Sequence, residues 1–147
     1  MSVISEDYFE AIQNKIAAHH KVQMYGHIET PYYQVQNRAV LIFSLEVVLE
    51  SHRAKYGTPA SPLKGKLALN HLLLLKYKWP LSEIRSLSLQ DALLALQEEL
   101  VLENLPENAQ VVVRMFNAHR ALPTFEQVID EEWDPVLYLT IPKQRNW

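Results

Sequence analysis

The chain has 147 residues, a length typical of one folded domain, and its 48% hydrophobic and 21% charged residues exclude an intrinsically disordered chain. It has no cysteine, which excludes disulfide bonds and thiolate zinc sites, and its formal net charge is −3. The first ten residues are polar and acidic, unlike a signal peptide, and no apolar run is long enough to span a bilayer, so we expect a cytoplasmic protein that does not associate with membranes.

The first predicted element is an amphipathic helix over residues 5–19. Ser5 is a suitable N-cap, two acidic residues follow it, and apolar side chains then recur at a four-residue spacing. Residues 24–36 mix glycine, proline and aromatic residues without a clear period, which predicts a surface loop. A second helix is predicted from an N-cap at Asn37 to Gly57, because glycine commonly follows the last turn of a helix.

The third predicted helix runs from Ser61–Pro62 to about Lys78. Proline suits the first helical position, because its φ is already helical and its missing N–H is not needed there. Leucines cover most of the circumference of this helix, which predicts that other helices surround it at the centre of the core. The pair Trp79–Pro80 ends the helix, and residues 81–85 predict one or two further helical turns.

The next predicted helix covers residues 89–100 and carries a stripe of leucines on one face. Ser88 followed by Asp91 three residues later resembles a capping box. Pro106 then begins another predicted helix, although the β-branched residues that follow it leave a strand as the alternative.

The C-terminal part is predicted to hold one short helix and an extended segment. Thr124 and Gln127 form a second capping pair, and residues 136–142 alternate as in a lone strand or an extended tail packed on the helices. No repeat or linker divides the sequence. We therefore predict an all-α fold in which residues 1–147 form a single compact multi-helix domain, with about five to seven helices and a short C-terminal extended segment.

Six histidines raise the alternative of a metal-dependent or histidine-based enzyme. The adjacent pair His19–His20 points about 100° apart on a helix, so a metal site would need His27 or His52 to join it. His71 and His119 lie among apolar residues, which favours hydrogen-bonded core histidines over a general base. Phosphate loops, nucleophile elbows and dinucleotide fingerprints are absent from the sequence, so we expect no enzyme activity, no cofactor and no bound metal.

Charge is unevenly distributed along the chain. Residues 53–78 contain six basic residues and no acidic one, whereas residues 80–108 contain one basic residue and six acidic ones. The basic segment supports an alternative function, the binding of nucleic acid or another anion. A pI near 6.1 argues against this alternative, because a phosphate-binding domain usually has an overall basic excess. The candidate anion-binding residues are Lys64, Lys66, Lys76 and Lys78.

The leucine-rich helices and an acidic-aromatic segment point to protein interaction. Trp133 and Tyr138 are candidate anchors for a protein partner, and Asp130 and Glu131 would steer a basic partner towards them. The alternative is that this segment folds onto its own domain. We expect a non-catalytic interaction or regulatory protein that binds a protein partner through an apolar helical surface and forms a homodimer, with nucleic-acid binding less favoured.

Overall fold

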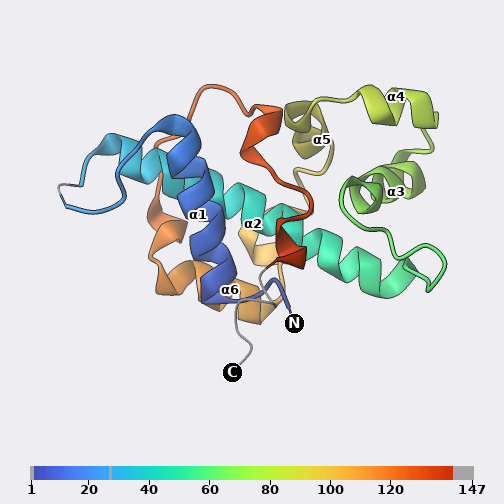
Figure 1. The fold of residues 1–147 in the computed structure, drawn as a ribbon, viewed down its shortest axis with the longest axis horizontal. Helices are drawn as coiled ribbons and strands as arrows, with labels where there is room; N and C mark the ends of the chain where they lie inside the picture. Colours follow the sequence, from blue (N-terminus) through green and yellow to red (C-terminus); the bar gives the residue numbers. More distant parts are fainter. Residues whose placement is uncertain (1, 27, 141–147) are drawn as a thin grey trace.

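The computed structural model describes residues 2–26 and 28–140. Within these ranges the chain forms six α-helices connected by loops and short 3-10 turns, with no β-strand, so the all-α prediction is confirmed (Figure 1). The α-helices are α1 (Glu6–His20), α2 (Thr30–Tyr56), α3 (Lys66–Tyr77), α4 (Leu81–Ser86), α5 (Leu89–Ala95) and α6 (Glu107–Met115). The 3-10 turns are η1 (Leu102–Asn104), η2 (Ala118–Arg120), η3 (Asp130–Glu132) and η4 (Leu137–Leu139).

Helix α2 is the centre of the fold. Figure 1 shows α2 running through the middle of the molecule, with α1 packed across it and α3, α4 and α5 grouped beside its C-terminal half. Buried side chains from all six helices belong to one hydrophobic cluster. The prediction that the leucine-rich third helix forms the centre is wrong, because Leu67 is 57% exposed and Leu75 is 36% exposed. Helix α3 packs on α2 and α4, contacts α5 through the hydrogen bond from the Tyr77 hydroxyl to the Ala95 carbonyl, and leaves Leu67 and Leu75 on its exposed side.

The predicted starts of α1 and α5 are confirmed by their capping hydrogen bonds. The Ser5 hydroxyl accepts from the backbone N–H of Tyr8 at 3.1 Å, and the Ser88 hydroxyl accepts from that of Asp91 at 3.1 Å. Helix α5 ends at Ala95, earlier than predicted, and turns occupy residues 96–100. The segment after Pro106 is helical, which decides against the strand alternative.

Helix α2 begins at Thr30, so the prediction of a loop up to residue 36 is wrong. Three amide side chains in its first turns explain the difference. Gln34, Gln36 and Asn37 donate hydrogen bonds of 2.8–3.1 Å to backbone carbonyls between residues 116 and 124. Because these partners lie about 80 to 90 residues away in sequence, the local pattern carries no sign of them.

The predicted helix start at Ser61–Pro62 is also wrong, because the chain forms a loop there before α3 begins. The guanidinium of Arg53 donates to the carbonyl of Leu63 at 2.9 Å and to that of Gly65 at 3.1 Å. Leu63 and Gly65 both have a φ of 59°, outside the right-handed helical region. Arg53 therefore stabilises a loop conformation at the point where proline predicted a helix.

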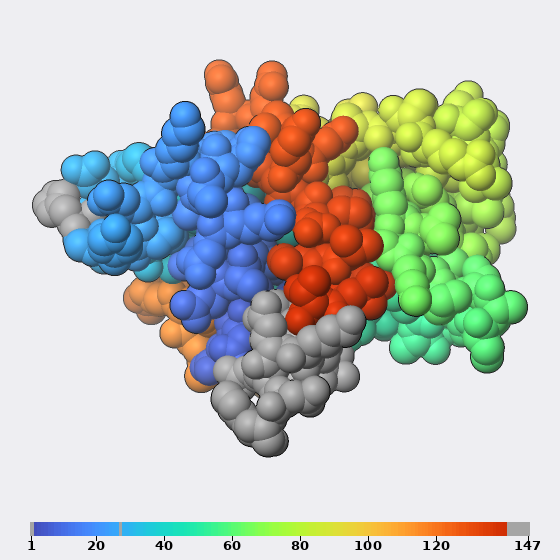
Figure 2. Space-filling view, in the orientation of Figure 1, coloured from blue at the N-terminus to red at the C-terminus, as the bar shows by residue number. Residues whose placement is uncertain are grey.

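The C-terminal segment, residues 121–140, crosses one face of the molecule. Figure 2 shows this segment, in orange and red, filling the space between α1 and α3. The short helix predicted after Thr124 is wrong, because residues 121–129 contain no helix. The prediction of a strand or extended segment over residues 136–142 is wrong for residues 137–139, which form η4, and residues 141 and 142 lie outside the described residues.

Candidate functional site

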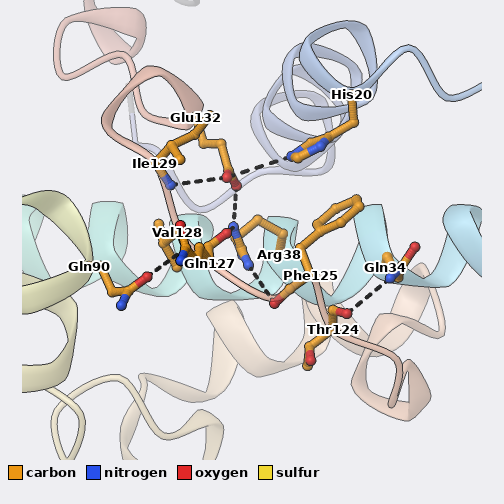
Figure 3. Close-up of polar contacts among 10 residues, drawn as sticks. All are labelled: His20, Gln34, Arg38, Gln90, Thr124, Phe125, Gln127, Val128, Ile129 and Glu132. Atoms are coloured by element: carbon orange, nitrogen blue, oxygen red, sulfur yellow. Dashed lines mark hydrogen bonds and ion pairs between the residues drawn. The ribbon is translucent and has the colours of Figure 1, made fainter.

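Arg38 of α2 holds the C-terminal segment onto the helices (Figure 3). Its guanidinium is 4% exposed, forms an ion pair with the Glu132 carboxylate, and donates to the carbonyls of Gln127 at 3.0 Å and Phe125 at 3.3 Å. The Glu132 carboxylate also accepts from the backbone N–H of Ile129 at 3.2 Å. Both charged groups are therefore engaged in positioning the segment, and this cluster is a structural one.

Besides Glu132, the described part of the chain buries a second acidic residue, Glu46 of α2. One carboxylate oxygen accepts from the hydroxyl of Tyr8 at 2.5 Å, and the other accepts from the indole N–H of Trp133 at 2.8 Å. Burial raises the pKa of Glu46 above its ordinary value, although the two hydrogen bonds act to lower it. The void beside it measures about 10 Å³, which leaves no room for a substrate. Glu46 thus joins α1, α2 and the C-terminal segment.

The two predicted aromatic anchors are both held against the protein's own domain. Trp133 is 8% exposed and hydrogen-bonded to Glu46, so it belongs to the core and is not accessible as an anchor for a partner. Tyr138 is half-buried, and its ring lies 4.1 Å from the guanidinium carbon of Arg53. The alternative that this segment folds onto its own domain therefore describes both aromatic residues. Both aromatic side chains cover charged groups of α2 that are wholly or partly shielded from water and need partners: Trp133 contacts Glu46, and Tyr138 contacts Arg53.

The two predicted steering residues, Asp130 and Glu131, are exposed. Asp130 accepts a hydrogen bond of 2.7 Å from the backbone N–H of Leu89, so it also attaches the C-terminal segment to the start of α5. Their side chains remain accessible to a partner.

The four lysines of the predicted anion site are exposed but lie at different places. Lys66 begins α3 and Lys78 follows its last turn, which separates them by about 18 Å along the helix axis. Lys76 forms an ion pair with Glu99, and Lys64 lies in the loop before α3. The structure therefore does not gather these lysines at one end of the helix.

His52 and His71 form a contact that the sequence did not predict. Nε2 of His52 lies 2.8 Å from Nδ1 of His71, which joins the C-terminal part of α2 to α3. Burial, followed by the neighbouring charge of His71, lowers the pKa of His52. His71 is half-buried and makes a hydrogen bond, as expected of a core histidine.

The remaining histidines do not join this pair. His20 stacks on Phe125, with 3.8 Å between the ring centroids, and His19 is exposed. His119 is exposed, so its predicted place in the core is wrong, and His27 lies outside the described residues. Among the residues that the structure describes, no group of three or more histidine or acidic side chains is arranged to hold a metal ion.

A cavity of about 190 Å³ lies between α3, α4, α5 and the C-terminal segment, and we call it the α3–α5 cavity. Its lining includes the exposed residues Lys66, Ser88 and Asp130, which mark its mouth. The side chain of Asn70 also lines it, and the amide oxygen of this residue is buried without a hydrogen-bond partner. The buried apolar lining consists of Leu69, Leu73, Ile84, Leu89, Ala92 and Trp133.

A shallower groove of about 430 Å³ lies on the other side of α5, and we call it the α5 groove. All of its lining residues are uncharged. Leu93 and Leu100 are buried, whereas Leu94 is 67% exposed and Val101 is 42% exposed. The complete lining is Leu41, Gln90, Leu93, Leu94, Gln97, Leu100 and Val101.

Only some of these residues have a recognisable sign in the sequence. Glu46 is a single acidic residue within the apolar stretch FSLEVVL, a pattern that suggests a buried carboxylate with a dedicated partner. Asn70 and the cavity have no such local sign, because helices distant in sequence form the walls.

Neither the fold nor the comparisons assign a function directly. Within the described ranges no helix is both long enough and apolar enough to cross a membrane. Comparisons with protein-family models, curated proteins and solved structures found no match to this chain.

Proposed function

We propose that the protein is a cytoplasmic, non-catalytic interaction or regulatory protein, and that the α5 groove binds a basic amphipathic segment of a protein partner. The observation that supports this proposal is the position of Leu94, which is 67% exposed in an uncharged groove and has acidic residues on both sides in the sequence. The cysteine-free composition supports the cytoplasmic location.

The groove offers apolar surface that a partner would remove from water. Leu93 and Leu100 form its buried floor, and the exposed side chains of Leu94 and Val101 border it. Complete burial of a leucine side chain is worth about 1.5–3 kcal/mol, so covering the exposed two thirds of Leu94 contributes about 1–2 kcal/mol. One such side chain therefore changes the affinity by about tenfold.

The surrounding charge favours a basic partner over a second copy of the chain. Asp91 precedes Leu94 by three residues within α5, a spacing that places the two side chains on the same side of the helix, and Glu98 lies in the turns that follow α5. Both acidic residues are exposed, and residues 80–108 carry a net charge of −5. The expected homodimer would bring two acidic borders together if it formed through this groove, whereas a basic segment would be attracted.

The experiment compares two short synthetic amphipathic helices, one built from leucine and lysine and the other from leucine and glutamate. Fluorescence anisotropy should show binding of the Leu/Lys peptide, and Leu94→Gln should weaken it about tenfold. Leu122→Gln is the matched control, because Leu122 is 81% exposed and lies outside the groove. This control should leave the affinity unchanged.

Three results would contradict the proposal. The first is equal binding of the two peptides, and the second is an equal loss of affinity in both leucine variants. The third is a dimer, measured by analytical ultracentrifugation, that Leu94→Gln dissociates, because this would place a second copy in the groove.

A further inference from the structure

We propose that the α3–α5 cavity binds a small molecule that has an apolar body slightly larger than benzene and a neutral head group, such as a hydroxyl or an amide. This site is separate from the α5 groove. Leu89 and Ala92 of α5 line the cavity, whereas Leu93 and Leu94 of the same helix line the groove.

The size and walls of the cavity suit an apolar body. Protein interiors contain few voids larger than a water molecule, and an apolar cavity of about 150 Å³ is already sufficient to hold benzene. The α3–α5 cavity measures about 190 Å³. Leu69, Leu73 and Ile84 line it and are each 1% exposed, so an apolar occupant would contact side chains that already lie in the core.

The mouth of the cavity suits a neutral polar head. Lys66 brings a positive charge and Asp130 a negative one, and both are exposed residues of the lining. A head group with either charge would be attracted by one of these residues and repelled by the other. A hydroxyl or an amide carries both a donor and an acceptor and meets no such repulsion.

The side chain of Asn70 adds an independent reason to expect a hydrogen-bonding occupant. Its amide oxygen is buried and has no hydrogen-bond partner among the described residues. An unsatisfied buried acceptor is unfavourable, and a rotation of the Asn70 side chain towards the cavity would let a donor on the occupant satisfy it.

The experiment uses three probes that share a phenylpropyl body: 3-phenylpropanol, 3-phenylpropionate and 3-phenylpropylamine. Binding is followed by NMR of isotope-labelled isoleucine and leucine methyl groups. We expect saturable shifts at Ile84, Leu69 and Leu73, with the alcohol binding more tightly than either ion. Ala92→Leu, which places extra carbon atoms in the cavity, should weaken the alcohol about tenfold, whereas Leu122→Gln, outside both sites, should leave its affinity unchanged.

A second variant keeps the test decisive if Ala92→Leu does not fold. Leu73→Ala enlarges the cavity and should bind 3-(2-naphthyl)propanol, whose body is one ring larger than that of the phenyl probe, at least about tenfold more tightly than wild type does. The absence of a saturable shift at Ile84 would overturn the proposal. Unchanged affinities in the folded variants, or tighter binding of either ion than of the alcohol, would also overturn it. None of these results depends on the peptide experiment, so the two proposals fail separately.

Discussion

The ion pair between Arg38 and Glu132 should be a major source of stability, and Arg38→Met tests this directly. Methionine retains an unbranched apolar side chain of similar reach but removes the guanidinium. The variant removes the guanidinium from the Glu132 carboxylate, which is 0% exposed, and leaves it only the His20 imidazole at 3.6 Å and the backbone N–H of Ile129. It also removes the donors to the carbonyls of Phe125 and Gln127.

The size of the effect follows from this burial. Removing one partner of a buried ion pair costs about 3–5 kcal/mol, because the remaining charge is left unpaired in a medium of low polarity. The total stability of a domain is about 5–15 kcal/mol, so the loss is a large fraction of it. For a chain of this length we expect the melting temperature to fall by about 10 °C.

Urea denaturation followed by circular dichroism measures the free energy of unfolding in each variant. In a double-mutant cycle, Arg38→Met combined with Glu132→Gln should cost about 1–3 kcal/mol less than the sum of the single changes. Lys15→Met is the control. The ion pair between Lys15 and Asp134, at 3.5 Å, has side chains that are 44% and 31% exposed, so its loss should cost less than about 1 kcal/mol.

Two results would refute this reasoning about Arg38. One is a loss of less than about 1 kcal/mol for Arg38→Met, as small as the loss for Lys15→Met. The other is additivity of the Arg38 and Glu132 changes, which would mean that the two charged groups stabilise the fold independently.

Two further predictions concern the buried carboxyl group and a glycine. Burial raises the folded-state pKa of Glu46 above its ordinary value of 4.5. Its contribution to stability is therefore complete below pH 4.5 and decreases as the pH rises through the raised pKa. Over this pH range the urea midpoint of wild type should fall further than that of Glu46→Gln. Identical pH profiles for wild type and variant would disprove the role of Glu46. Gly57→Ala should lower the free energy of unfolding by about 1–3 kcal/mol in the same assay, because the added Cβ would lie 2.6 Å from the carbonyl oxygen of Arg53. Gly26→Ala is the comparison, since its Cβ meets no atom within 4 Å and only its φ of +80° is strained, and equal losses in the two variants would contradict the steric explanation.

Helix starts were predictable where the stabilising interaction is local. Ser5 and Ser88 each cap a helix through a backbone N–H only three residues away, so the signal and its partner lie in the same short stretch. The start of α2 and the loop after it were not predictable in this way. Pro31 in the first turn of α2 is a local sign of its start, but the hydrogen bonds of Gln36 and Arg53 that hold these two segments have no local sequence signature.

The sequence indicated apolar helices and an acidic segment, but it did not indicate where the groove and the cavity lie. The leucine-rich composition correctly indicated apolar helical surfaces, and the acidic segment around α5 was visible as a run of charges. Of the two interpretations left open for Trp133, folding onto its own domain describes the structure, because its indole N–H meets the buried carboxylate of Glu46, 87 residues away. The α3–α5 cavity likewise requires three helices and the C-terminal segment to meet.

The amino-acid sequence by itself determined the helical class, the two serine caps and the charge around α5, because helix formation and capping depend on groups a few residues apart. Only the tertiary structure decided which apolar faces are covered and which stay open. The physical reason is that hydrophobic attraction has no direction, so any leucine stripe can pack on any other. In this protein, buried hydrogen bonds between distant residues determine which faces pack together. Those of Arg38 and Glu46 hold the C-terminal segment against α1 and α2. The cavity and the groove remain open on either side of α5.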